Sequence, residues 1–196
     1  MTQISEAYRE QNRQLHETNA SYGAGEATSH WFPMVAHFAQ VIGAASILDY
    51  GCGKGKMRRE LSSFMIIPYD PCVPEFSDEP DAHDLVVCLD VLEHVEPELL
   101  DSVLDDIQRL AQKAVFLTVH MGAAIKTLPD GRNAHLIQQP ISWWLPKLMQ
   151  RWDLTAVRKP ESFEFLFTGR PHAMNDAEVA RRSQKLADLK AAEVRQ

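Results

Sequence analysis

The chain has 196 residues, 45% of them hydrophobic, which is enough to fill the core of one α/β domain but not comfortably of two. Its 20 basic and 27 acidic residues give a formal net charge of −7, which disfavours a nucleic acid partner without excluding a local basic patch. The three cysteines form no Cys-x-x-Cys pair, which argues against a disulfide framework and a structural zinc site.

The N-terminal residues are polar where a signal peptide would be apolar, and no run approaches the ~20 apolar residues of a membrane span. We therefore expect a cytoplasmic protein without a membrane partner. Nothing in the sequence indicates the oligomeric state.

The first 44 residues predict an N-terminal helical segment. Residues 1–20 are polar with helical spacing, and two glycines interrupt the pattern within 21–29. In 30–44, apolar residues recur three and four positions apart, which predicts an amphipathic helix. A glycine-broken segment of this kind can serve as a lid over a binding site.

From residue 45 onward, apolar runs alternate with helical patterns. Strands are predicted at 46–51, 64–70, 83–91, 113–120, 154–160 and 162–170, and helices at 56–64, 96–112 and 141–152. This alternation predicts an α/β fold with a Rossmann-like, doubly wound, mostly parallel sheet that closes on an antiparallel strand pair. We expect this domain to span 45–172, and a charged helix to follow at 173–196.

The loop "LDYGCGKGK" at 48–56 carries three glycines directly after the first strand. In a phosphate-binding P-loop, the glycine before the lysine follows the first glycine by five positions, and a hydroxyl residue follows the lysine. Gly55 follows Gly51 by only four positions, and Met57 lacks a hydroxyl. The dinucleotide fingerprint fails because Lys56 stands where its third glycine would be.

Two acids flank this loop. Asp49 ends the first strand, where it can accept hydrogen bonds from a ligand's ammonium group, and Asp70 ends the second strand 21 residues later. An acid in the latter position can bind ribose hydroxyls. A nucleoside with an ammonium group and no phosphate fits S-adenosylmethionine.

The segments "ILDYGCGKG", "YDP" and "DLVVCLDVLEHVEPE" resemble the successive motifs of class I S-adenosylmethionine-dependent methyltransferases, over roughly residues 45–120. The stretch at 128–148 is similar to a bacterial or phage branch of that family. The resemblance implies that the glycine loop surrounds the methionine moiety, that the second acid holds the ribose, and that the backbone after the third strand meets the methionine end. The implied cofactor contacts are Asp49, Gly51, Cys52, Gly53, Asp70, Pro71, Leu89 and Asp90.

One departure from the family pattern follows Asp70. Family members place a helix and a strand between the ribose-binding acid and the next core strand, whereas only residues 71–83 join Asp70 to Asp84 here. We therefore expect a sheet one strand short of seven, and the adenine contact stays unassigned.

Asp90, Glu93 and His94 would share one face if their segment were helical. Two carboxylates and an imidazole can bind a divalent metal, Mg or Zn, or can act in acid–base catalysis. The pattern resembles metal-assisted small-RNA 2′-hydroxyl and ubiquinone-pathway O-methyltransferases, which carry Glu at the first position; the shorter Asp90 weakens the case for direct coordination. An ordinary loop-to-helix junction explains the same residues.

Three histidines are candidates for removing a proton from a hydroxyl acceptor: His94, His120 at the end of a strand, and His135 in the polar loop "PDGRNAH". The loop fits an acceptor pocket or a plain turn. We predict methyl transfer to a small-molecule or sugar acceptor, on oxygen. The alternatives are an RNA or nucleotide methyltransferase, including a metal-assisted 2′-O type, and a non-catalytic S-adenosylmethionine-binding regulatory protein.

Overall fold

The computed structural model describes residues 2–159 and 163–172. The predicted C-terminal helix at 173–196 lies outside them. The strands are β1 (Ile47–Tyr50), β2 (Ile66–Tyr69), β3 (His83–Leu89), β4 (Ala111–His120), β5 (Trp152–Arg158) and β6 (Glu164–Pro171). The helices are α1 (Glu6–Thr18), α2 (Phe32–Val41), α3 (Lys56–Glu60), α4 (Leu100–Leu110) and α5 (Ile141–Met149), with short 3-10 turns at Ser29–Trp31, Pro74–Phe76, Leu92–His94 and Pro97–Leu99.

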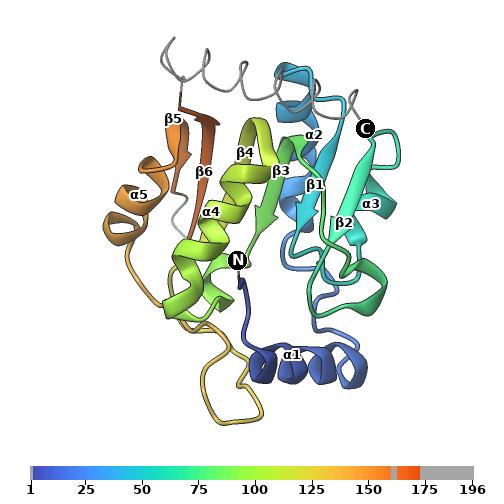
Figure 1. Ribbon diagram of the computed structural model, residues 1–196, viewed down its shortest axis with the longest axis vertical. Coiled ribbons are helices and arrows are strands. Elements are labelled where there is room, and N and C mark those ends of the chain that lie inside the picture. The colour runs from blue at the N-terminus through green and yellow to red at the C-terminus, as the bar shows by residue number, and fades with distance from the viewer. Residues whose placement is uncertain (1, 160–162, 173–196) are drawn as a thin grey trace, which may run out of the picture.

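The strands form one sheet in the order β2-β1-β3-β4-β6-β5 (Figure 1). The first four are parallel, whereas β6 runs antiparallel to β4, and β5 antiparallel to β6. The predicted doubly wound sheet with a closing antiparallel pair is confirmed. The described residues contribute six strands, as expected from the short connection after β2.

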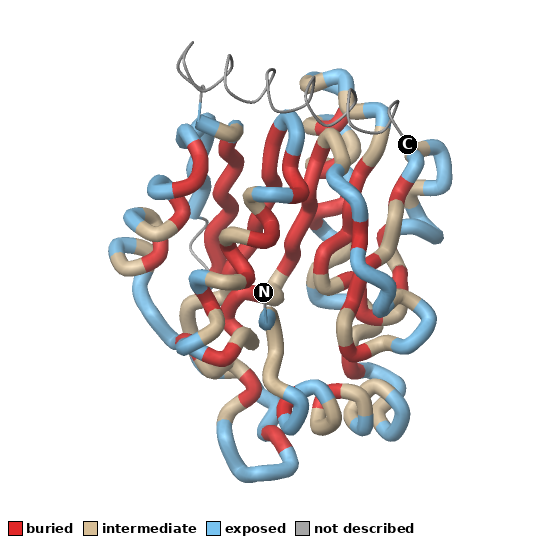
Figure 2. The backbone as a smooth tube through the Cα atoms, in the orientation of Figure 1, coloured by how far each residue is buried: buried red, intermediate tan, exposed pale blue. Residues whose placement is uncertain are grey.

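Helices cover both faces of the sheet, which explains why its strands are apolar on both sides. On one face, Leu104 of α4 and Trp144 of α5 are fully buried in the larger core cluster. On the other face, Val35 of α2 packs in a second cluster with Leu85 and Phe116 of the central strands. Figure 2 shows the buried strands between these two layers.

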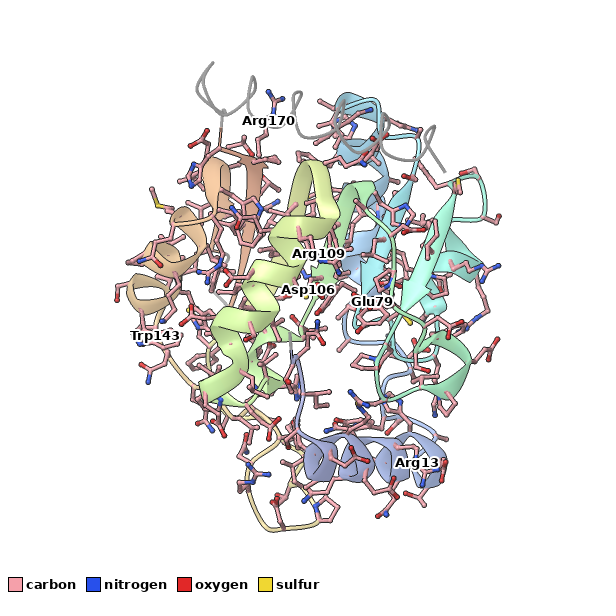
Figure 3. The ribbon with its side chains drawn as sticks, viewed as in Figure 1. Arg13, Glu79, Asp106, Arg109, Trp143 and Arg170 are labelled. Carbon is pink, nitrogen blue, oxygen red and sulfur yellow. The ribbon has the colours of Figure 1, made fainter. Side chains whose placement is uncertain are left out.

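A group of polar contacts fixes α4 to the carboxyl end of β1. The buried Asp106 accepts hydrogen bonds from the Tyr50 hydroxyl (3.1 Å) and from Arg109 (2.7 Å). Arg109 also contacts Glu79 (3.4 Å), in the connection after β2, and Figure 3 shows these three charged side chains near one another. The short 71–82 connection is thereby tied to α4.

Helix α1 lies across the carboxyl ends of the parallel strands, at the bottom of Figure 1. Ser5 caps its N-terminus by accepting from the Tyr8 amide (3.3 Å) and donates to Glu96 through its own amide (2.8 Å) and hydroxyl (2.6 Å). The Tyr8 hydroxyl donates to the His94 carbonyl (2.8 Å). These bonds dock the N-terminal segment on the loop that follows β3.

The three helices predicted after residue 45 all end earlier than expected. Helix α3 ends at Glu60, where a turn leads toward β2; α4 ends at Leu110 and α5 at Met149, because the residues that follow lead into strands β4 and β5. The expected helical face of Asp90, Glu93 and His94 does not form. Asp90 has a left-handed backbone (φ 53°), and only Leu92–His94 make a 3-10 turn. Among the described helices, none is long and apolar enough to cross a membrane.

Candidate functional site

A cavity of about 560 Å³ lies at the carboxyl ends of the parallel strands. Its walls come from α1 and the loop after it, the glycine loop, the ends of β2 and β3, and the loop at 121–135. All eight predicted cofactor residues and all three candidate catalytic histidines line it: Asp49, Gly51, Cys52, Gly53, Asp70, Pro71, Leu89, Asp90, His94, His120 and His135. The topology of a parallel sheet brings these distant segments together.

The backbone N–H groups of residues 51–55 all donate to acceptors of the protein itself. These acceptors are the carbonyls of Tyr69 (2.8 and 3.0 Å), Gly23 (2.8 Å) and Cys52 (2.9 Å), and the Asp70 carboxylate (3.0 Å). A phosphate-binding loop instead points its N–H groups at the ligand. The loop therefore has no free backbone N–H group to bind a phosphate, which favours a ligand without one.

Two glycines of the loop sit where no side chain fits. Gly51 has φ 80° and Gly53 has φ 52°, in the left-handed region. A Cβ atom at Gly51 would collide with Val91, and one at Gly53 with the carbonyl oxygen of Gly23. These contacts let the glycine loop approach both the end of β3 and the N-terminal segment.

Asp70 holds the loop in place. Its carboxylate accepts from the amides of Gly53 (3.0 Å) and Cys72 (2.9 Å), one on each oxygen. Burial raises the pKa of Asp70, and these two hydrogen bonds oppose that rise.

Asp49 lacks such partners. No residue among 2–159 and 163–172 donates a hydrogen bond to its carboxylate, and only 5% of the residue is exposed. Burial raises the pKa of Asp49 to about 7, with a further contribution from the nearby Asp70 charge. An unpaired carboxylate of this kind favours a positively charged group in the cavity beside it.

At the other end of the cavity, Glu93, His94 and His135 form a cluster whose ligand atoms all lie within 4.8 Å of one another. The predicted set of Asp90, Glu93 and His94 is thus rearranged: His135 joins the group, and Asp90 is not a member. Asp90 instead accepts a hydrogen bond from the Thr118 hydroxyl (3.0 Å). The left-handed backbone at Asp90 separates it from the turn that carries the other two residues.

Two polar atoms of this cluster are buried without a hydrogen-bond partner in the described parts of the chain: Glu93 Oε2 and His94 Nδ1. The other Glu93 oxygen accepts from the His120 amide (2.9 Å). Burial raises the pKa of Glu93 and lowers that of His94 to about 4. Buried polar atoms without partners are uncommon in folded proteins and indicate a missing ligand or a functional role.

A hydrogen bond to Gly122 shows which nitrogen of His135 carries the hydrogen. His135 Nδ1 lies 2.7 Å from the Gly122 carbonyl oxygen, which can only accept, so Nδ1 carries the hydrogen and Nε2 the lone pair. His120 Nδ1 lies 3.2 Å from the Gly122 amide and 3.3 Å from the Gly122 carbonyl oxygen, so these contacts are compatible with either tautomer of His120. The rings of His120 and His135 are 4.9 Å apart.

The sequence patterns missed two ionisable residues near the cavity. His16 lines it from α1, although nothing in the polar helical pattern of 1–20 distinguishes it from its neighbours. Glu164, at the start of β6, lies against Asp90, accepts from the Trp31 indole (2.5 Å), and has a pKa raised to about 7 by burial first and the Asp90 charge second. The docking of α1 brings His16 to the site, and the pairing of β6 with β4 brings Glu164 there.

The structure resembles several solved methyltransferases. The 1,6-didemethyltoxoflavin-N1-methyltransferase of Burkholderia thailandensis has a TM-score of 0.63 and 15% identity, over 85% of this chain and 88% of that one. Magnesium protoporphyrin IX methyltransferase of Synechocystis PCC 6803 has a TM-score of 0.61 and 12% identity, over 87% and 100%. The N-methyltransferase NodS of Bradyrhizobium japonicum WM9 has a TM-score of 0.58 and 13% identity, over 86% and 100%.

At these identities the structural similarity establishes the fold. None of the curated proteins compared with the chain matches its sequence significantly. A family model does match: the methyltransferase domain family aligns with residues 9–164, which include the glycine loop, both strand-end acids and the three candidate catalytic histidines. The chain therefore belongs to the methyltransferase domain family and is a class I S-adenosylmethionine-dependent methyltransferase, as its motifs predicted.

Proposed function

We propose that the protein transfers the methyl group of S-adenosylmethionine to an oxygen atom of a small molecule or sugar bound in the cavity at the strand ends. The observation that carries the proposal is that the two ends of this cavity hold different groups. Unpartnered Asp49 and the fully engaged glycine loop lie at one end, and the histidine cluster lies at the other.

The cofactor end suits a cationic nucleoside. Asp49 attracts the ammonium group of the methionine moiety, and Asp70 has lone pairs left for ribose hydroxyls beyond its two bonds to backbone amides. Cys52, Pro71 and Leu89 add backbone and apolar contacts along the same wall. The sulfonium methyl then points along the cavity toward the histidines.

At the acceptor end, His135 is the residue best suited to take the acceptor's proton. Its Nε2 carries a lone pair, burial lowers its pKa so that it is neutral, and it lines the cavity. In the reaction a bond forms between the acceptor oxygen and the methyl carbon as the carbon–sulfur bond breaks. The bonding electrons stay on sulfur, and the hydroxyl proton passes to Nε2. His94 and His120 pack around this ring and restrict its position.

A metal-assisted form of the same reaction is a second candidate, favoured by the two unpartnered atoms Glu93 Oε2 and His94 Nδ1. With His135 they offer one carboxylate and two imidazoles, a donor set that fits zinc better than magnesium. A metal bound there would act as a Lewis acid on the acceptor oxygen. Metal analysis of the purified protein separates the two forms: about one zinc per chain, lost in Glu93→Gln but not in the exposed Glu79→Gln, supports the metal, and a protein that takes up none after zinc addition contradicts it.

Small molecules are favoured over RNA by the net charge of −7 and by the size of the cavity, about 560 Å³, which is within the range of small-molecule sites. The test supplies S-adenosylmethionine labelled in its methyl group to a metabolite extract and to total RNA in parallel. Label in small molecules supports the proposal, and label in RNA alone would overturn the choice of acceptor. With ¹³C as the label, the chemical shift of the transferred methyl group distinguishes an oxygen from a nitrogen acceptor.

A further inference from the structure

We propose that His16 of α1 is a cofactor-binding residue, which holds one hydroxyl of the cofactor's ribose while Asp70 holds the other. The inference rests on the placement of S-adenosylmethionine proposed above. It adds to the site a residue from a segment far from the glycine loop in sequence.

The first observation is an imidazole nitrogen without a partner. His16 stands in the last turn of α1 and lines the same cavity as Asp49 and Asp70. Its Nδ1 atom is buried and has no hydrogen-bond partner in the part of the chain that the structure describes. A buried nitrogen without a hydrogen-bond partner is uncommon in folded proteins and indicates a ligand, a water molecule or a functional role.

The second observation is that Tyr22 and Gly23 pack closely against the imidazole ring. Tyr22 packs against it edge-on, with ring centroids 4.8 Å apart, and the Tyr22 hydroxyl donates to Asn12 on the same helix (2.5 Å). Gly23 has φ 64° and lies so close to the imidazole that a Cβ atom there would collide with it. Its two neighbours therefore restrict the ring to one position.

The third observation ties Gly23 to the glycine loop. The Gly23 carbonyl accepts from the Lys54 amide (2.8 Å), and the Lys54 ammonium donates to the carbonyls of Asn19 (3.1 Å) and Ala20 (3.0 Å). The loop that positions His16 is thus fastened to the loop that positions the cofactor. The end of α1 and the glycine loop form two walls of one compartment.

The fourth observation is the relation of His16 to Asp70. The Asp70 charge acts on the imidazole, but the two side chains, both of which the structure describes, make neither a hydrogen bond nor an ion pair. Burial, Lys54 and Lys126 lower the pKa of His16, so the ring is neutral near pH 7. A carboxylate and a neutral imidazole that face one cavity without touching each other suit a vicinal diol, whose hydroxyls both donate and accept.

The test measures the affinity of S-adenosylhomocysteine and of its 2′-deoxy and 3′-deoxy analogues by calorimetry, for the wild type and for two variants. His16→Leu removes the hydrogen bond, and His16→Asn keeps a polar atom close to the place of Nδ1. We expect His16→Leu to bind S-adenosylhomocysteine about 10-fold more weakly than the wild type, the effect of one lost hydrogen bond. His16→Asn should recover most of that loss.

The analogues separate a direct contact from a structural role. For the deoxy analogue that lacks the hydroxyl contacted by His16, the wild type and His16→Leu should bind equally. An equal loss for all three ligands would show that His16 acts only through folding and would overturn the inference, as would unchanged binding in His16→Leu. If His16→Leu does not fold, His16→Gln, whose amide lies further from the backbone, takes its place with the same expectations. A wild type that binds none of the three ligands would contradict the proposed function instead.

Discussion

The two ends of the cavity are built differently. At the cofactor end, every N–H group of residues 51–55 and both Asp70 oxygens have protein partners, whereas the Asp49 carboxylate and His16 Nδ1 have none in the described residues. At the acceptor end, Glu93 and His94 each keep a buried atom without a partner. A glycine loop with all its N–H groups engaged thus faces a cluster with unpartnered polar atoms. In the function proposed above, the cofactor end determines where the methyl group lies, and the acceptor end determines what receives it.

The largest expected effect comes from the acceptor end. His135→Gln removes the lone pair that takes the acceptor's proton, so kcat should fall about 10²- to 10⁴-fold while cofactor affinity stays the same. His37→Gln, at an exposed position on α2, is the control and should be fully active. If His135→Gln weakened cofactor binding as much as turnover, the assignment of separate roles to the two ends would be wrong.

Gly53→Ala tests the packing of the cofactor end. The new Cβ would collide with the Gly23 carbonyl, which costs about 1–3 kcal/mol of overpacking in addition to about 1–2 kcal/mol for a left-handed residue with a side chain. Gly131→Ala is the matched control, because Gly131 also has a positive φ (88°) but has open space around it. Urea denaturation should show the larger loss in Gly53→Ala, and equal losses would contradict the close contact of the two glycine segments.

Asp49→Asn should lower the affinity for S-adenosylmethionine about 10- to 100-fold, since it removes a charged partner of the ammonium group. Asp84→Asn serves as the control, because Asp84 lies at the start of β3, away from the cavity, and pairs with Lys113 (2.9 Å). Calorimetry measures both variants. Unchanged affinity in Asp49→Asn would show that the ammonium group binds elsewhere.

The pH dependence of cofactor binding gives the smallest effect. The pKa of Asp49 in the ligand-free protein is about 7, and only the ionised form attracts the ammonium group, so affinity should fall by up to about tenfold per unit as pH drops below 7. The folding stability of the ligand-free protein should change with pH in the opposite direction. The pKa of Asp49 is higher in the folded state than its ordinary 3.8, so its contribution to folding stability declines as pH rises from about 4 to 7. Asp49→Asn should flatten both profiles, and an unaltered profile in this variant would assign the titration to another group.

The two ends also differ in how far the sequence predicted them. Asp49, the glycines and Asp70 follow directly after apolar strands, so the sequence predicted that they would meet at one edge of the sheet, and all of them line the cavity; their contacts with the cofactor stay a prediction. At the acceptor end, Asp90, Glu93 and His94 would share one face only if their segment were helical. The chain instead turns through a left-handed residue at Asp90, which helical spacing cannot represent.

His16 and Glu164 show a second limit of the sequence. They come from α1 and from the antiparallel β6, and they reach the site only through long-range packing. Neither residue lies in a motif, and local patterns cannot indicate such contacts. Residues 2–159 and 163–172 form six strands and not seven, as predicted from the length of one connection, which the sequence shows directly.

Calorimetric titration with S-adenosylhomocysteine of the wild type and of Asp70→Ala tests the central claim most directly. The wild type should bind one equivalent per chain. Asp70→Ala should bind at least about 10-fold more weakly, because the glycine loop loses its anchor and the ribose its acceptor. Absence of binding by the wild type at millimolar ligand, or equal affinity of the two proteins, would contradict the claim that this cavity is the cofactor site.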